Sequence, residues 1–361
     1  MNYVIDEISL HENHAGSKAR DDVNFILENN GFVLKSLNYS YGGSIFKLLN
    51  KFFNETKDLK KILKSFKKGD MVLIQHPLIC YSTHLGEFIK KTSKKKGYKT
   101  VLLIHDLDEL RFDKFLGKFK KGKFSNMVRD EISYLDSFDY IISHNCSMTN
   151  YIKSKGIDSK KLIDLLLFDY IANIPENDSE KNVNRHVVIA GNLDVSKAGY
   201  IYKLKDIESN IYNFELYGVN YSGENNNFCH YNGSFKPEEL LMHINNGFGL
   251  IWDGDSLGDC TGILGRYTRY NNPHKLSLYI ACGIPVIVWK KAAIAKFVID
   301  NNIGYTVNSL SEIESLLSNI NDYNYKEFKN NVINIQRKVL KGSFLIDSIK
   351  EIEKRENEEG K

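Results

Sequence analysis

The residues best placed to bind a charged ligand lie in the stretch 271–289, NNPHKLSLYIACGIPVIVW. Pro273 pre-sets the backbone for the start of a helix, so His274 and Lys275 fall in its first turn. Amides in that turn lack intrahelical partners and the helix dipole is positive, so acidic side chains are favoured there. A lysine at this place therefore indicates a bound anion, on which amides and ammonium converge. A plain surface helix before a core strand is the alternative.

The elements that must position Lys275 follow from the neighbouring residues. Gly283 is typical of a helix end, and the run IPVIVW after it is typical of a buried parallel strand. The run GFGLIWDG before the stretch predicts a further strand, and residues 255–270 are expected to form a loop. Lys197, in GNLDVSK, follows a strand end on a Gly-Asn turn. It is a second candidate for binding phosphate, with a solvated lysine as the alternative.

Polar residues also follow strands in the first half of the chain. After the strand expected at 3–8, a loop ends in Gly16, and Ser17 is the expected N-cap of the next helix. Phosphate or sugar oxygens can approach the backbone closely at such a turn, which makes Gly16, Ser17 and Lys18 candidates; an ordinary βα turn is the alternative. Gln75 closes MVLIQ, and His105 follows TVLLI together with Asp106. Ligands of open α/β sheets bind at this edge.

The rhythm of strands and helices predicts an α/β fold with two doubly wound, Rossmann-like domains. A length of 361 residues suits two domains. Strands alternate with helices through residues 1–170. Residues 171–185 are polar and have no apolar period, so they are expected to be a linker. Residues 186–341 form the second expected domain, and a helix is expected within 342–361.

Composition narrows the classes of function. A net charge of +4 does not demand a nucleic-acid partner. The five cysteines are scattered and form no C-x-x-C pair, which argues for a reducing cytosol and against a zinc or disulfide framework. The first residues do not read as a signal peptide, and no apolar run approaches the roughly 20 residues that span a bilayer. A cytoplasmic protein is expected.

The stretch NPHKLSLYIACGIPVIV resembles the nucleotide-binding signature of bacterial GT-B glycosyltransferases. More closely, it resembles the family of the glucosyltransferases that modify serine-rich adhesins and of the related galactofuranosyltransferases. The resemblance continues through AGSKARDDV, LIHDLDELR, DYIISHN, FDY and GLIWDG. It implies a GT-B fold, with two Rossmann-like domains facing a cleft and a last helix that crosses back to the first domain.

The resemblance also implies a UDP-sugar donor, with glucose or galactofuranose as the sugar. Lysines and helix N-termini would stabilise the departing diphosphate, so no cofactor and no metal are expected. It places base and ribose contacts at Asn192, Tyr217 and Ser234; for Tyr217 a core position is the alternative. The signature itself supplies Asn272, Pro273, His274 and Lys275.

Two glutamates spaced E-x7-E mark the large retaining branch of this fold, and their places here hold Tyr270 and Leu278. Their absence favours an inverting displacement, which needs a general base on the acceptor side. Asp106 is the best candidate, beside His105 at a strand end, although such an aspartate is often a helix cap. The competing carboxylates are Asp108, Glu109 and Asp169.

Asp253 and Asp255, in WDGDS, have the spacing of a D-x-D motif that holds Mg²⁺ in another glycosyltransferase architecture. We expect instead a loop near the active cleft, because the lysine signature already supplies positive charge.

The sequence therefore predicts a hexosyltransferase that uses a UDP-sugar. Its acceptor would be a sugar such as N-acetylglucosamine on a glycoprotein or cell-surface glycan intermediate. A non-catalytic glycan- or nucleotide-binding partner subunit of a transferase is the alternative. Three lysine-rich runs are interpreted as solvated helix faces, as contacts in a homo-oligomer, or as peripheral contacts with the inner face of a membrane. They are residues 57–68, 90–99 and 114–124, and the lysines of the last run are interleaved with Phe112, Phe115, Phe119 and Phe124.

Overall fold

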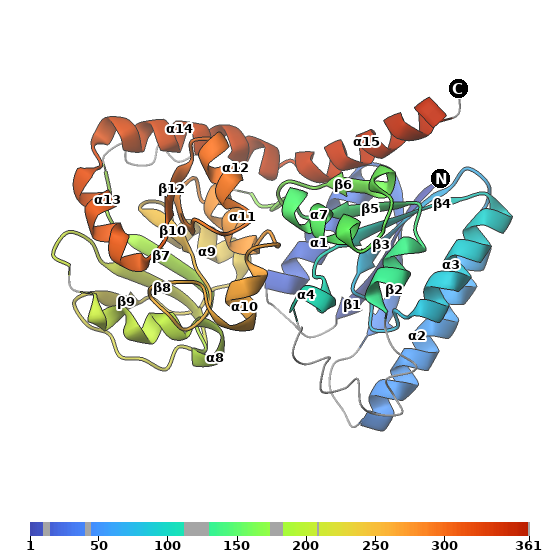
Figure 1. Cartoon of the computed structure of the whole chain (residues 1–361), viewed down its shortest axis with the longest axis horizontal. Coiled ribbons are helices and arrows are strands. Elements are labelled where there is room, and N and C mark those ends of the chain that lie inside the picture. Colours follow the sequence, from blue (N-terminus) through green and yellow to red (C-terminus); the bar gives the residue numbers. More distant parts are fainter. Residues whose placement is uncertain (10–14, 40–44, 112–129, 174–182, 208, 360–361) are drawn as a thin grey trace. The chain divides into compact units, whose positions relative to one another are not determined.

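The computed structural model describes residues 1–9, 15–39, 45–111, 130–173, 183–207 and 209–359. The chain divides into two compact units (Figure 1). The first unit holds Met1–Leu165 and Leu345–Lys361, and the second holds Leu166–Phe344. The second unit thus begins just before the segment 171–185, which was predicted to be a linker. Residues 174–182 of this segment lie outside the described residues.

The first unit is built on a parallel six-stranded sheet in the order β2-β1-β3-β4-β5-β6. Near-continuous apolar runs such as MVLIQH, all buried, form these strands because both faces of the sheet are covered. The order reverses between β1 and β3, and ligands of such sheets bind at this point of reversal. The strands are β1 (Asn2–Ser9), β2 (Phe32–Tyr39), β3 (Met71–His76), β4 (Lys99–Ile104), β5 (Tyr140–Ser143) and β6 (Leu162–Asp164).

Local capping sets the helix ends of the first unit. Ser82 accepts a hydrogen bond from the Leu85 amide at the start of α3, and Gly97 ends that helix with a φ of 77°. The helix α1 begins before Ser17, so the prediction of Ser17 as its N-cap is wrong. The helices are α1 (Ala15–Asn29), α2 (Ile45–Ser65), α3 (Thr83–Lys96), α4 (Asp108–Arg111), α6 (Glu131–Asp136), α7 (Cys146–Ser154), η2 (Ser159–Lys161) and α15 (Ser343–Glu359).

The last helix, α15, is bound to the first unit by polar contacts from its final turns. Glu356 accepts hydrogen bonds from Lys99 at 2.8 Å and from the Tyr140 hydroxyl at 2.6 Å. The Arg355 guanidinium donates to the carbonyl groups of Lys160 and Leu162 at 3.0 and 3.1 Å. The chain therefore returns to its first sheet after completing the second.

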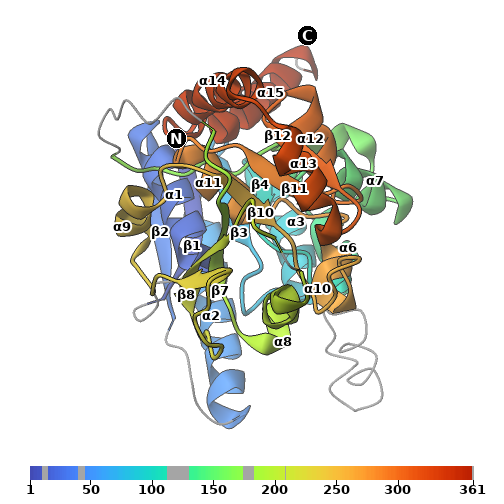
Figure 2. The same ribbon diagram turned by 90° about the vertical axis from the view of Figure 1, so that its left-hand side faces the viewer.

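The second unit holds another parallel six-stranded sheet, in the order β12-β11-β10-β7-β8-β9. Figure 2 shows β10, β7 and β8 side by side, and the point of reversal lies between β7 and β10. The strands are β7 (Val187–Asn192), β8 (Phe214–Val219), β9 (Cys229–Tyr231), β10 (Phe248–Ile251), β11 (Val286–Trp289) and β12 (Gly304–Val307).

The helices of the second unit pack on an apolar core that includes both tryptophans, Trp252 and Trp289, each fully buried. They are α8 (Val195–Ala198), η3 (Gly199–Asp206), α9 (Pro237–His243), α10 (Gly262–Tyr267), α11 (His274–Ala281), α12 (Ala295–Asp300), η4 (Leu310–Glu312), α13 (Ile313–Asn319) and α14 (Asp322–Val339). Two doubly wound α/β units confirm the fold class that the sequence predicts. Within the described residues, no helix is both long and apolar enough to cross a membrane.

Candidate nucleotide and acceptor sites

The helix α11 begins as the sequence predicts. Pro273 is its N-cap residue, with φ −69° and ψ 136°, and its carbonyl accepts a hydrogen bond from the Leu276 amide at 2.9 Å. His274 and Lys275 are the first helical residues. The positive end of the helix dipole therefore lies at the carboxyl edge of the second sheet, next to the point of reversal.

Lys275 lies between the ends of the two strands that flank this point. Its Nζ is 3.1 Å from Asp253 Oδ1 and 3.5 Å from the Trp252 carbonyl oxygen, just after β10. A Cβ built on Gly191, in β7, would lie 3.5 Å from Lys275 Cε. The side chains of Lys275 and Asp253 are only 17% and 14% exposed, so their attraction is weakly screened. Asp253 thus holds the ammonium in place, and the other ammonium protons can reach a phosphate oxygen.

The glycines at the ends of β7 and β8 let these backbones approach closely. Gly191 and Gly218 are paired across the two strands and have φ values of 127° and 148°. A Cβ on Gly218 would lie 1.7 Å from the Gly191 carbonyl oxygen, which no side chain can do without moving the backbone. The close pairing of β7 and β8 beside Lys275 therefore depends on both glycines.

We expect Gly218→Ala to unfold the second unit or to lower its free energy of unfolding by more than about 3 kcal/mol, through backbone overlap added to left-handed strain. Urea titration of the wild-type protein and of the variant measures this change in the free energy of unfolding. The matched control is Gly233→Ala, because Gly233 also has a positive φ, of 95°, but a Cβ there would meet nothing within 4 Å. The free energy of unfolding should fall by only about 1–2 kcal/mol in Gly233→Ala. Equal losses for the two variants would contradict the close approach of the strands.

Two further predicted residues lie on the loop after β7. Asn192 Oδ1 accepts hydrogen bonds from the Asp194 amide at 3.0 Å and from Asn220 Nδ2 at 3.2 Å. Lys197 lies in α8, half-buried, and its carbonyl accepts a hydrogen bond from the Gly254 amide at 3.4 Å. This bond joins the loops that follow β7 and β10, so the structure brings Asn192, Lys197 and Lys275 to one edge of the sheet.

Tyr217 and Ser234 belong to the same edge. Tyr217 is half-buried at the end of β8, and burial raises the pKa of its hydroxyl. The Gly218 amide donates to the Gly233 carbonyl at 2.8 Å, which places the exposed Ser234 beside the end of β8. Both positions are compatible with base and ribose contacts, and that role stays a prediction.

Asn272 and His274 fix the helix α11 within its unit. Asn272 is 2% exposed, and its Nδ2 donates to the Leu166 carbonyl at 3.0 Å. The His274 ring stacks on Phe168 with centroids 4.5 Å apart, and the Ser277 hydroxyl donates to the Phe168 carbonyl at 2.7 Å. These contacts indicate that Asn272 positions the helix, while its prediction as a ligand contact stays untested.

In the first unit, a chain of buried amides leads to His105. The Asp6 carboxylate, ion-paired with Arg20, accepts from Asn24 Nδ2 at 2.9 Å. Asn24 Oδ1 accepts from Gln75 Nε2 at 2.7 Å, and Gln75 Oε1 lies 2.6 Å from His105 Nε2. A carboxylate can only accept, so Asn24 must direct its NH₂ group to Asp6 and its oxygen to Gln75. Gln75 in turn directs its NH₂ group to Asn24 and its oxygen to His105, so Nε2 of His105 is assigned as the donor in the last bond.

Asp106 follows His105 at the carboxyl edge of β4. Its carboxylate forms an ion pair with Arg111, and both side chains are about one third exposed, at 31% and 34%. The buried Glu131 accepts hydrogen bonds from the amides of Asp108 and Glu109 at 3.0 and 2.7 Å. Glu131 thereby fixes the start of α4, and Arg111, at the end of α4, holds the carboxylate of Asp106.

The competing carboxylates already have partners of their own. Asp108 accepts from the Tyr81 hydroxyl at 2.8 Å, and Glu109 pairs with Lys155 at 2.6 Å. Asp169 is buried in the second unit, where it accepts from the Phe344 amide at 3.2 Å. Asp106 is likewise paired, with Arg111, and its role as the general base stays a prediction.

The structure places the third group of acceptor candidates in α1. Gly16 is its second residue, and Ser17 and Lys18 follow, both half-buried. Lys18 forms an ion pair with Asp22, one turn further on. In the first sheet, α1 follows β1, which neighbours the point of strand reversal.

The two aspartates of the D-x-D spacing have separate partners in the structure. Asp253 is paired with Lys275, and the Asp255 carboxylate accepts from the Thr261 hydroxyl, a bond that lowers the pKa of Asp255. Across the described residues, a cluster of at least three His, Cys, Asp or Glu ligand atoms occurs at Glu7, Glu55 and Cys80, in the first unit.

Sequence reasoning missed the role of Asp253 and the chain through Asn24. The glycines that end two neighbouring strands, Gly191 and Gly218, were the available signal for a close approach at the site of Lys275. No local sequence pattern predicts the hydrogen bond between Asn24 and Gln75, because the two residues are 51 positions apart in the chain.

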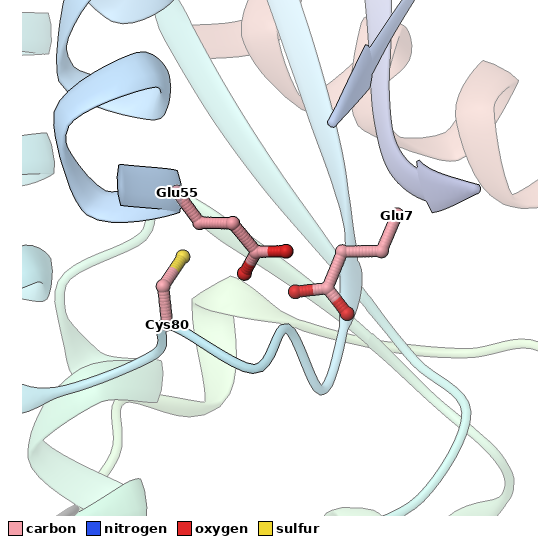
Figure 3. A group of neighbouring side chains, drawn as sticks. All are labelled: Glu7, Glu55 and Cys80. Carbon is pink, nitrogen blue, oxygen red and sulfur yellow. The ribbon is translucent and has the colours of Figure 1, made fainter. Parts of the chain in front are cut away.

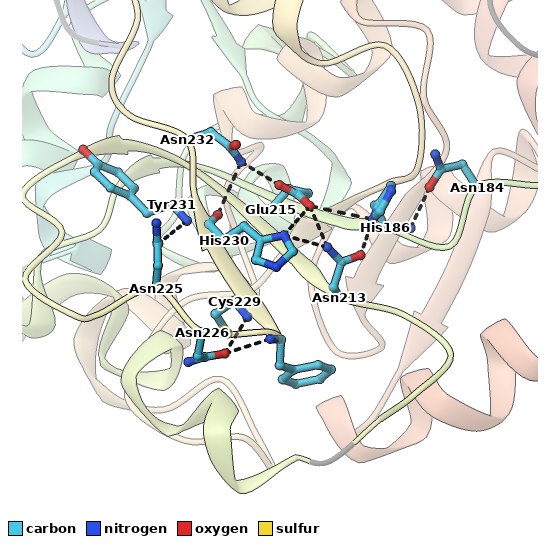
Figure 4. A network of polar contacts seen from close by, with 11 residues as sticks. Asn184, His186, Asn213, Glu215, Asn225, Asn226, Cys229, His230, Tyr231 and Asn232 are labelled. Carbon is cyan, nitrogen blue, oxygen red and sulfur yellow. Dashed lines mark hydrogen bonds and ion pairs between the residues drawn. The ribbon is translucent and has the colours of Figure 1, made fainter.

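A second polar network lies at the opposite edge of the second sheet (Figure 4). Glu215 Oε1 accepts from Asn213 Nδ2 at 2.6 Å and lies 3.0 Å from His230 Nδ1. His186, which precedes β7, contacts Asn213. Since Glu215 is paired with Val188 near the start of β7, this network lies away from Lys275 and ties the amino ends of three strands together.

Two doubly wound parallel sheets of six strands each are the architecture of the GT-B glycosyltransferases. The models of the glucosyltransferase 3-like N-terminal and C-terminal domains match residues 1–167 and 187–352. The β-1,6-galactofuranosyltransferase WbbI of Escherichia coli (strain K12) is 33% identical over 357 residues, which cover 97% of this chain and 98% of that protein.

Glucosyltransferase 3 of Streptococcus parasanguinis is 25% identical over 298 residues, 80% of each chain. Among solved structures, the lipopolysaccharide outer core galactosyltransferase WaaB has the same fold, with a TM-score of 0.57 at 12% identity, over 97% of this chain and 99% of that one. The chain belongs to the glucosyltransferase 3-like family. It is a glycosyltransferase that uses a nucleotide sugar.

Proposed function

We propose that this protein transfers a hexose, glucose or galactofuranose, from a UDP-sugar to a sugar acceptor. The observation that carries the proposal is Lys275 at the start of α11, held by Asp253 at the point where the strand order of the second sheet reverses. A diphosphate leaving group needs positive charge that is fixed in place before the reaction. Lys275 and the first amides of α11 supply it there.

The names of two relatives support the choice of donor sugar. One relative is named as a β-1,6-galactofuranosyltransferase and another as a glucosyltransferase. The higher identity to the first, 33% against 25%, favours galactofuranose as the transferred sugar.

The acceptor would bind to the first unit, along the carboxyl edge of its sheet. Gln75 orients the His105 ring, whose Nε2 lies 2.6 Å from Gln75 Oε1, beside the candidate base Asp106. Asp106 would then take the proton from the attacking hydroxyl. Its ion pair with Arg111 orients the carboxylate.

An inverting displacement is supported by Tyr270 and Leu278, which replace the glutamate pair of the retaining branch. The β linkage in the name of the E. coli relative agrees, because a β product from an α-linked nucleotide donor requires inversion. A single in-line attack needs one base, and Asp106 supplies it.

A donor screen tests the proposed function and its independence of metal together. With N-acetylglucosamine glycosides as acceptors, UDP release should be well above background with UDP-galactofuranose or UDP-glucose. Adding Mg²⁺ or Mn²⁺ should change the initial rate by less than about twofold, since Lys275 already provides the charge that Mg²⁺ supplies elsewhere. Release that stays at background with every acceptor would favour a non-catalytic partner subunit, and a rate that depends on Mg²⁺ would contradict metal independence.

A further inference from the structure

A group of metal-ligating side chains that does not include Asp106 lies in the first unit. Glu7 comes from β1, Glu55 from α2, and Cys80 from the segment after β3. One ligand atom from each lies within 4.8 Å of the other two. Figure 3 shows the carboxyl groups of Glu7 and Glu55 pointing toward each other, with the sulfur of Cys80 beside Glu55.

Two of the three side chains are buried, and Glu7 is half-buried. Glu55 is 5% exposed and Cys80 is fully buried. Carboxylates taken out of water are destabilised unless positive charge accompanies them. The nearby Arg20 is itself ion-paired with Asp6, and a cation bound between the two carboxyl groups would supply such charge.

A second observation, independent of the acidic pair, points to a missing group. Tyr134 is fully buried, and its hydroxyl has no hydrogen-bond partner. Its ring packs against that of Tyr81, the neighbour of Cys80 in the chain, with centroids 5.5 Å apart. A buried hydroxyl without a partner is destabilising, so a group to which it can hydrogen-bond is expected beside it.

We infer that Glu7, Glu55 and Cys80 bind a divalent cation of the zinc type, with the Tyr134 hydroxyl hydrogen-bonded to a water that completes the coordination. Zn²⁺ accepts thiolate and carboxylate ligands together, whereas Mg²⁺ and Ca²⁺ prefer oxygen alone. A tetrahedral centre separates its ligand atoms by roughly 3.3–3.6 Å, so shifts of about 1 Å close the site. On binding, the Cys80 thiol and any protonated carboxyl group of the pair release their protons to solvent, and zinc forms bonds to the sulfur and to the two carboxylate oxygens.

The site joins the end of β1, the helix α2 and the segment after β3, on both sides of the point where the strand order reverses. Its role would be structural, since it fixes α2 against the edge of the sheet that carries the acceptor candidates. The inference does not depend on the proposed function, because metal binding is measured without donor or acceptor.

Cobalt substitution of the full-length wild-type protein tests the inference directly. Adding Co²⁺ to chelator-treated protein should produce the near-ultraviolet charge-transfer band of a cobalt–thiolate bond, at one Co²⁺ per chain, and Zn²⁺ should displace it. The band should vanish in Cys80→Ala and persist in Cys146→Ala, the matched control, since Cys146 is a free and exposed thiol. A band that persists in Cys80→Ala, or no band in the wild-type protein, would overturn the inference.

Two conservative variants check the remaining ligands by competitive Zn²⁺ titration. Glu55→Gln keeps the shape of the side chain and should weaken Zn²⁺ binding at least tenfold. Tyr134→Phe removes only the hydroxyl and should weaken Zn²⁺ binding about 10- to 100-fold, as loss of an outer partner does. If the two carboxyl groups merely share a proton, neither variant will change Zn²⁺ affinity, and Zn²⁺ will not raise the melting temperature of the wild-type protein.

Discussion

Replacing Lys275 by alanine should weaken UDP binding by about 10- to 150-fold, which corresponds to the loss of one charge-assisted contact worth about 1.5–3 kcal/mol. The physical reason is the position of the ammonium, which is 17% exposed and held 3.1 Å from Asp253 at the start of α11. A phosphate bound there is poorly screened by water. Isothermal titration with UDP measures the change.

The matched control for this experiment is Lys296→Ala. Lys296 lies in the same unit and also pairs with a carboxylate, Asp300, but its side chain is 73% exposed. An exposed pair of this kind contributes little, so UDP affinity should stay within about twofold of the wild-type value. UDP binding that is untouched by Lys275→Ala would remove Lys275 from the site.

The second large effect is expected from Asp106→Asn. This change keeps the shape of the side chain and removes its basicity, so the turnover number should fall by about 10²- to 10⁴-fold, while UDP affinity stays unchanged. Initial rates of UDP release with saturating donor and acceptor measure the first quantity, and titration measures the second.

Asp108→Asn is the control for Asp106, because Asp108 lies two residues away and is held by Tyr81 at 2.8 Å. It should retain most of the turnover. A larger loss in Asp108→Asn than in Asp106→Asn would move the general base to Asp108. A loss of UDP affinity in Asp106→Asn would indicate a change of structure, and the kinetic comparison would then carry no weight.

The fold could be predicted from the sequence because its signals are local. Apolar runs such as MVLIQ and TVLLI form strands buried on both faces, and glycines or a proline end the neighbouring elements. The start of α11 after Pro273 followed from the fixed φ of proline and the positions of the flanking apolar residues.

The expected loop at 255–270 was wrong in part, because residues Gly262–Tyr267 form the helix α10. Two glycines within six residues argue against a helix on propensity alone. Gly265 and Tyr267 are nevertheless buried there. A Cβ on Gly265 would lie 2.5 Å from the carbonyl carbon of Cys260, so the glycine allows the helix to pack closely. Tertiary packing thus outweighed propensity at α10.

The partners within the candidate sites could not be predicted, since they come from residues far apart in the chain. Asp253 meets Lys275, 22 residues further along the chain, because β10 ends and α11 begins at the same edge of the sheet. The orientation of His105 depends on Asn24 and on Asp6, which lie on other elements of the first unit. The sequence placed residues at an edge, and only the structure shows which side chains meet.

We expect the donor diphosphate to bind at the start of α11. A crystal structure of the protein with bound UDP should show phosphate oxygens within about 3 Å of Lys275 Nζ and of the first amides of α11. Phosphates bound at another place, with Lys275 still paired only to Asp253, would contradict it.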